Sequence, residues 1–205
     1  MLHRSTVDSQ TYELLQKLFS ISIIGNHFAL AGGTALALQI GHRTSIDLDV
    51  FNPGIFDVKE LEIILSDTKD IHFQYRGNNS RMLFADINGI KCDFVHEPAT
   101  LLEPFILSDA VKYFSLPDIG AMKLHTICGR GKKKDFFDIY CLLQLFSWEV
   151  MVQWFIDKYD ESQLVFLWRS ILYFDDANAD PDIIGFNPFN TKWEQIKKYI
   201  KLTCN

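Results

Sequence analysis

Residues 31–50 read AGGTALALQIGHRTSIDLDV, and this stretch decides the fold that the sequence predicts. The apolar residues 27–31 predict a strand, the pair Gly32-Gly33 ends it, and a helix is predicted from Thr34 to Ile40. In this order of elements, the backbone N–H groups at the start of the helix face whatever lies over the glycine turn. The stretch therefore indicates a place where a phosphate group approaches the chain.

An acidic pair follows the loop at residues 41–45. Asp47 and Asp49 are two residues apart in a predicted strand at residues 46–51, so both carboxylates leave the same face. The opposite face is expected to be buried and to carry Ile46, Leu48 and Val50. Two carboxylates so close raise each other's pKa, and a cation between them relieves the repulsion. Because Mg²⁺ is commonly held by one or two carboxylates together with substrate phosphates, the pair predicts a metal site.

Asp93 is the favoured third acid of this site. It lies in the apolar segment Lys91-Cys92-Asp93-Phe94-Val95, and if this strand pairs beside the strand at residues 46–51, three carboxylates converge. Such a cluster can hold two metal ions about 4 Å apart, as in many phosphoryl-transfer sites. Asp93 would also suit the role of general base toward an acceptor hydroxyl. Asp86 is the competing candidate, but it lies only two residues before the turn at Asn88-Gly89.

The remaining pattern predicts an α+β chain in two parts. Helices are expected at residues 9–19 and 58–65, and strands at 71–75, 81–87 and 91–96, the last two joined by a tight hairpin turn at Asn88-Gly89. From about residue 101 the pattern becomes helical, with helices at 117–129, 134–146, 149–159 and 162–173, an irregular stretch at 175–190, and a last helix from Thr191. We therefore expect an α/β core at residues 1–100 and a helical lobe at residues 101–205.

Composition narrows the class of protein. With 48% hydrophobic and 22% charged residues, the chain has the make-up of an ordinary globular protein, and its net charge of −6 argues against non-specific coating of nucleic acid. The four cysteines form no CxxC or Cys/His pattern, so neither a zinc site nor a disulfide framework is expected. A polar N-terminus and the lack of an apolar run of about 20 residues predict a cytoplasmic protein without a membrane partner. The densest basic run, residues 130–134, predicts where a polyanion would dock.

At this point the sequence resembles a known family. The residues that carry the likeness are Gly32, Gly33, Thr34, Gly41, His42, Arg43, Ser45, Asp47 and Asp49, which resemble the signature of the nucleotidyltransferase superfamily typified by DNA polymerase β. Within that superfamily the chain is most similar to the AbiEii/AbiGii toxin family of bacterial abortive-infection and toxin–antitoxin systems. The late motif of that family is matched by Lys123, Arg130, Lys134, Asp135 and Asp138. The resemblance spans residues 28–145.

The resemblance implies a polymerase β-like nucleotidyltransferase core, a mixed sheet flanked by helices, followed by a C-terminal helical lobe. It implies that Asp47 and Asp49 bind the metal and that Lys123 neutralises phosphate charge, while Asp93 is added to the metal and catalytic set by its pattern. The nucleotide-binding set is Gly32, Gly33, Thr34, Arg43, Ser45, Lys123, Arg130, Lys134 and Asp138.

Helical spacing bears on the late motif in two ways. Lys123 and Arg130 are seven residues apart, so they are expected to share one helical face and to meet a transferring nucleotide there. Asp135 and Asp138 also share a face. A structural role is equally open to these two acids, at the positive end of a helix dipole or paired with Arg130 or Lys134.

The predicted function is transfer of a nucleoside monophosphate from an NTP to an acceptor hydroxyl, with Mg²⁺ or Mn²⁺ and release of pyrophosphate. The resemblance implies an RNA acceptor, such as the 3′ end of tRNA, and a toxin that is paired with an antitoxin protein. The basic run at residues 130–134 favours a polyanionic acceptor. Three alternatives stay open: a small-molecule nucleotidyltransferase of the antibiotic-modifying type, a protein acceptor, and a non-catalytic module that binds a partner protein.

Overall fold

One mixed sheet organises the first part of the chain in the computed structural model, which describes residues 2–205. Within these residues the strand order is β3-β4-β5-β2-β1-β7-β6. The strands are β1 (Ala29–Leu30), β2 (Leu48–Asn52), β3 (Phe73–Asn79), β4 (Met82–Ile87), β5 (Ile90–His96), β6 (Ile106–Ser108) and β7 (Val111–Tyr113). β2 pairs with β5 and β1 pairs with β7 in parallel, and the other neighbours are antiparallel.

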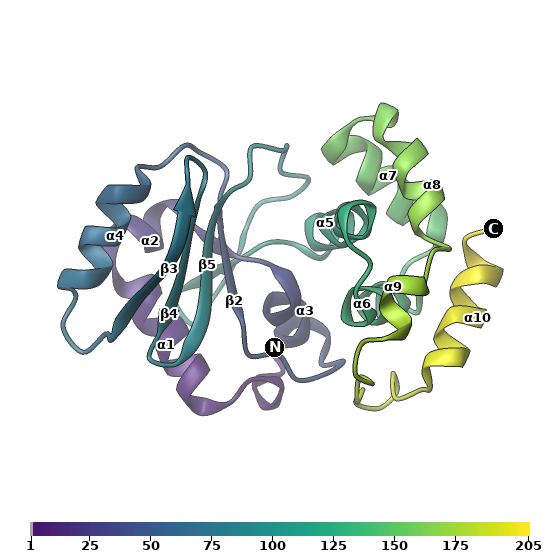
Figure 1. Ribbon diagram of the computed structural model, residues 1–205, viewed down its shortest axis with the longest axis horizontal. Coiled ribbons are helices and arrows are strands. Elements are labelled where there is room, and N and C mark those ends of the chain that lie inside the picture. The colour runs from purple at the N-terminus through teal and green to yellow at the C-terminus, as the bar shows by residue number, and fades with distance from the viewer. Residues whose placement is uncertain (1) are drawn as a thin grey trace.

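Helices surround this sheet and then form the rest of the molecule (Figure 1). Those of the first part are η1 (Arg4–Thr6), α1 (Ser9–Ser20), α2 (Ser22–His27), α3 (Gly32–Ile40) and α4 (Val58–Asp67). The later ones are α5 (Leu116–Gly129), α6 (Lys133–Leu143), α7 (Trp148–Tyr159), η2 (Glu161–Gln163), α8 (Leu164–Ser170), α9 (Asp175–Asn178) and α10 (Trp193–Thr203). In Figure 1, α1, α2 and α4 lie on one side of the sheet, and α3 lies on the side of the later helices.

Local sequence signals explain several of these elements. Asp8 caps α1 by accepting a hydrogen bond from the backbone N–H of Thr11, and Ser115 caps α5 in the same way. The hairpin between β4 and β5 turns at Asn88 and Gly89, which both have positive φ, as the predicted tight turn requires. The α+β arrangement of the chain follows from these local signals and from burial of the apolar faces between the layers.

Two expectations about secondary structure are wrong. The strand predicted at residues 27–31 is reduced to β1, because α2 extends to His27 and only two residues pair with β2. The chain also does not turn helical at residue 101, since β6 and β7 follow and extend the sheet beyond β1 through the pairing of Tyr113 with Leu30. A division into two domains stays a prediction, and these strands argue for a boundary after Tyr113 rather than at residue 100.

A buried ion pair joins two of the late helices, and its acid also binds the segment between β5 and β6. Lys158 of α7 lies 2.8 Å from Asp118 of α5, and both side chains are fully buried. Asp118 also accepts hydrogen bonds from the backbone N–H groups of Leu102 and Glu103, in the segment that leads from β5 to β6. Within residues 2–205 no single helix is long and apolar enough to cross a membrane, although α6 and α7, bent by 117°, pass such a test as a pair.

Candidate active site

The acidic residues meet on one face of the sheet where β2 lies beside β5. Asp49 and Asp93 are directly opposite each other in the parallel register of these strands, which confirms the predicted strand pairing. Asp47 immediately precedes β2 and is partly exposed. The prediction that Ile46 is buried is wrong, because β2 begins only at Leu48 and the side chain of Ile46 is 64% exposed.

Asp49 is the carboxylate of this face that has no cation in contact with it among residues 2–205. Burial raises the pKa of Asp49. The charges of Asp93 and Asp47 raise it further, whereas those of Lys123 and Lys91 act to lower it. None of the hydrogen bonds or ion pairs within residues 2–205 involves the Asp49 carboxylate. Asp49 is therefore a carboxylate that gains from any cation placed beside it.

Lysines neutralise the two neighbouring acids instead. Lys91 Nζ lies 2.7 Å from Asp93 Oδ2, while Asp93 Oδ1 is buried and has no hydrogen-bond partner within residues 2–205. Lys134 Nζ lies 3.6 Å from Asp47 Oδ2. The competing candidate Asp86 lies on β4, which β5 separates from β2, so Asp93 is the acid beside Asp49.

The donor set fits a hard divalent ion in its chemistry. Carboxylate oxygens are the ligands that Mg²⁺ and Mn²⁺ prefer, and the unpartnered oxygen of Asp93 is a free acceptor in the middle of the face. As the side chains stand, no three Asp, Glu, His or Cys residues between 2 and 205 are arranged to hold a metal ion. Two of the three acids contact lysines instead.

The glycine pair makes room for the site's own side chains. Gly32 has φ +67°, and a Cβ atom at this position would lie 2.3 Å from Asp49 Oδ2. A Cβ atom on Gly33 would lie 2.6 Å from Nη2 of Arg43. No side chain caps α3, so the N–H groups of its first turn stay available to an anion.

We expect Gly32→Ala to lower both thermal stability and nucleotide-transfer activity, because a methyl group would displace the Asp49 carboxylate. Gly89→Ala is the matched control, since Gly89 has φ +81° but open space around its Cβ position. Both variants carry the strain of a positive φ, of about 1 kcal/mol. Thermal unfolding and transfer rates measure the difference, and equal losses of activity in both variants would contradict the steric explanation.

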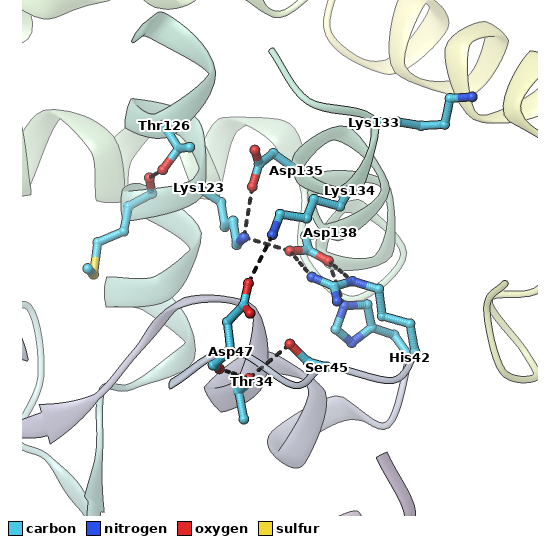
Figure 2. Close-up of polar contacts among 12 residues, drawn as sticks. Thr34, His42, Ser45, Asp47, Lys123, Thr126, Lys133, Lys134, Asp135 and Asp138 are labelled. Carbon is cyan, nitrogen blue, oxygen red and sulfur yellow. Dashed lines mark hydrogen bonds and ion pairs between the residues drawn. The ribbon is translucent and has the colours of Figure 1, made fainter. Parts of the chain in front are cut away.

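A second cluster is centred on the buried carboxylate of Asp138 in α6 (Figure 2). Arg43 donates two hydrogen bonds to this carboxylate, from Nε to Oδ1 at 2.7 Å and from Nη2 to Oδ2 at 2.9 Å. His42 Nε2 lies 2.8 Å from Oδ1, and Lys123 Nζ lies 2.6 Å from Oδ2. Burial alone would raise the pKa of Asp138. The charges of Arg43 and Lys123 and the hydrogen bond with His42 instead hold this pKa well below its ordinary value. Pairing with Arg130 or Lys134, one of the structural roles left open for Asp135 and Asp138, does not occur, because Asp135 pairs with Lys123 and Asp138 with Arg43 and Lys123.

His42 belongs to the predicted signature, but the sequence predicts no role for it in the site. Its ring is fully buried, stacks on Phe137 with centroids 5.8 Å apart, and has a pKa lowered by burial. A neutral ring whose Nε2–H donates to Asp138 fits this environment. Only its position directly before Arg43, the partner of Asp138, could have pointed to it.

Several residues of the predicted nucleotide-binding set are bonded to one another. Lys123 Nζ contacts Asp135 Oδ1 at 3.0 Å in addition to Asp138. The Thr34 hydroxyl donates to the carbonyl oxygen of Asp47 and lies 2.9 Å from Ser45 Oγ. These contacts hold the loop at residues 41–47 against α3 and α6, so the side chains position the acidic pair.

The basic side chains of residues 130–134 point in different directions. Arg130 lies beyond the end of α5 with extended backbone and is exposed, so the prediction that it shares a helical face with Lys123 is wrong. Figure 2 shows Lys134 directed toward Asp47 and Lys133 directed away from the cluster, where Lys133 pairs with Asp182 at 3.0 Å. Of the basic residues at positions 130–134, Lys134 is the one that lies beside the acidic pair.

This combination of a glycine turn, an acidic face and a buried lysine cluster has a counterpart among known families. The sequence model described as nucleotidyl transferase AbiEii toxin, type IV TA system, matches residues 13–202. The chain belongs to this family. The AbiEii assignment confirms the predicted family, the nucleotidyltransferase class of enzyme, and the α+β fold with a polymerase β-like core.

Individual proteins are similar to this chain in sequence or in fold. An uncharacterized protein of Aquifex aeolicus is 29% identical over 195 residues, which is 92% of this chain and 91% of that protein. MenT4, a nucleotidyltransferase toxin from Mycobacterium tuberculosis, superposes with a TM-score of 0.55 at 13% identity, over 93% of this chain and 80% of that one. JHP933 from Helicobacter pylori gives a TM-score of 0.51 at 14% identity, over 96% and 93% of the two chains. At such identities the superpositions show the fold.

Proposed function

We propose that this AbiEii nucleotidyltransferase toxin transfers a nucleoside monophosphate from an NTP to a hydroxyl of an RNA acceptor and releases pyrophosphate. The observation that carries the proposal is the register of Asp49 opposite Asp93 on neighbouring strands, beside the uncapped start of α3. Acids on one sheet face and free N–H groups next to them suit a triphosphate whose charge is shared between a divalent ion and the helix.

Asp47, Asp49 and Asp93 would hold Mg²⁺ or Mn²⁺, which neutralises phosphate charge and polarises the phosphate undergoing attack. The N–H groups at Gly32 and Gly33 bind phosphate oxygens at the start of α3. Asp93 accepts the proton of the acceptor hydroxyl. In this assignment each acid acts from a strand, which fixes its direction.

Lys123 acts electrostatically from within the Asp138 cluster. Burial works to lower the pKa of Lys123, but Asp138 and Asp135 outweigh this effect and raise it, so the ammonium group stays charged. Its field reaches Asp49, where it opposes the rise in pKa. A fixed cation at this place stabilises negative charge that develops on the transferred phosphate. Arg43 and Asp138 then position Lys123 and the acidic loop. Lys134, which lies beside Asp47, and the exposed Arg130 are the cations left to meet the nucleotide.

An RNA acceptor, with the 3′ end of tRNA as the leading candidate, is favoured by the basic loop between α5 and α6. Arg130 and Lys132 are exposed there, and Lys134 of the same run reaches the acidic pair. The family description also supports an antitoxin protein as a partner. Four cysteines without a disulfide among residues 2–205 accord with a cytoplasmic location.

The test is incubation of the protein with each labelled NTP, Mg²⁺ and total RNA, followed by separation of RNA, protein and small molecules. Label in the RNA fraction, with release of pyrophosphate, is the expected result. Label only in small molecules or only in protein would favour the corresponding alternative acceptor. Transfer to none of these fractions, together with an Asp47→Ala variant that binds NTP and metal as well as the wild type, would favour a non-catalytic binding module.

A further inference from the structure

Lys91 is a charged residue of the acidic face to which the proposed reaction gives no role. It lies on β5 two residues before Asp93, so the two side chains leave the same face of the sheet. Its ammonium group lies 2.7 Å from Asp93 Oδ2. The Lys91 side chain is 39% exposed and that of Asp93 is 13% exposed, so the pair lies at the mouth of the site.

Among residues 2–205, Asp93 is the acid with which Lys91 forms its ion pair. Asp86, directly across from Lys91 on β4, does not receive its ion pair. Lys91 also lines a surface hollow together with Asp47 and Asp86, so ions from solvent reach the place that its ammonium group occupies.

We propose that Lys91 is the resident counter-cation of the acidic site and competes with the divalent ion for the Asp93 carboxylate. This inference rests on the proposed metal site of Asp47, Asp49 and Asp93. Without substrate, the ammonium group covers Asp93 Oδ2, and a divalent ion gains full access to Asp93 only when Lys91 moves away. This explains why no three acids stand ready to hold a metal ion among residues 2–205.

The competition has a consequence for the order of binding. With Lys91 at Asp93 and Lys134 at Asp47, a divalent ion would bring four positive charges among three carboxylates, so a metal alone is bound weakly. The triphosphate supplies the negative charge that lets both cations stay, because Lys91 then pairs with a phosphate oxygen. Metal uptake by the wild-type protein should therefore be coupled to the nucleotide.

The experiment measures binding of Mn²⁺ to the full chain by the loss of the free-ion EPR signal, with and without a non-hydrolysable NTP. Lys91→Met and Lys91→Gln should bind Mn²⁺ at least about tenfold more tightly than the wild type without nucleotide, because one unit of positive charge is removed from the site. The nucleotide should then raise their affinity less than that of the wild type. Using two neutral variants keeps the test decisive if one of them folds poorly, as thermal unfolding would reveal.

Lys91→Arg keeps the charge and should bind Mn²⁺ within about twofold of the wild type. Lys59→Met on α4 is the matched control for net charge, because Lys59 is exposed on the opposite side of the sheet. Unchanged or weaker Mn²⁺ binding by both neutral variants would overturn the inference and leave the metal site standing. No Mn²⁺ binding by any of the proteins, even with nucleotide, would overturn the metal site and this inference together.

Discussion

Asp49→Asn is expected to abolish nucleotide transfer while leaving the protein at least as stable as the wild type. Loss of a residue that only orients a metal ligand typically costs about 10–100-fold in activity or metal affinity, so loss of a direct ligand should exceed 100-fold. The substitution also removes a half-buried charge that has no ion pair among residues 2–205 and whose pKa burial raises. Stability gained with activity lost is the pattern expected of a functional residue rather than a structural one.

Asp86→Asn is the matched control for this variant. Asp86 is an acid on the same sheet, but it is one strand further from β2 and directly across from Lys91. The Asp86→Asn variant should keep a transfer rate within about threefold of the wild type, because Asp86 has no place in the proposed site. Its stability should also stay close to that of the wild type, because surface substitutions rarely change the free energy of unfolding by more than about 0.5 kcal/mol. Label transfer and thermal unfolding give both quantities. An active Asp49→Asn, or an inactive Asp86→Asn, would contradict the choice of acids.

Local signals in the sequence were sufficient for the elements that lead to the site. The Gly32-Gly33 break, the alternation around Asp49 and the turn at Asn88-Gly89 each depend on neighbouring residues. The structure has the start of α3, the strand β2 and a tight turn at these places. β6 and β7 escaped prediction because each has three residues, too few to show alternation. Their place in the sheet depends on the pairing of Tyr113 with Leu30, which no local pattern contains.

Of the site residues, too, some could be predicted from local sequence and others could not. The acids could be predicted, because two carboxylates on one strand face demand a partner of opposite charge whatever the fold. Their counter-ions could not, since a lysine or arginine pairs with whichever acid the tertiary structure brings near. Arg43 and Asp138 are 95 positions apart and bind each other, whereas the sequence favoured partners of Asp138 within its own helix or the preceding turn.

Asp138→Asn is expected to lower the free energy of unfolding by about 3–5 kcal/mol, the typical cost of removing one partner from a buried ion pair. The substitution keeps the shape of the side chain but leaves the buried guanidinium of Arg43 and the buried ammonium of Lys123 short of a negative charge. Asp70→Asn is the control, because the carboxylate of Asp70 pairs with Lys17 at 3.5 Å and is 88% exposed. Exposed pairs contribute about 1 kcal/mol or less.

Urea unfolding of the two variants, combined with the KM for NTP, separates the two roles that the sequence left open for Asp138. A residue that positions Lys123 and the acidic loop should lose stability and transfer rate together, because the cations it holds become free to repel each other. If Asp138→Asn instead keeps its stability and only raises the KM, then Asp138 binds the nucleotide directly and its contacts to His42, Arg43 and Lys123 are rearranged in the substrate complex. The buried position of the carboxylate and its four short contacts favour the first result.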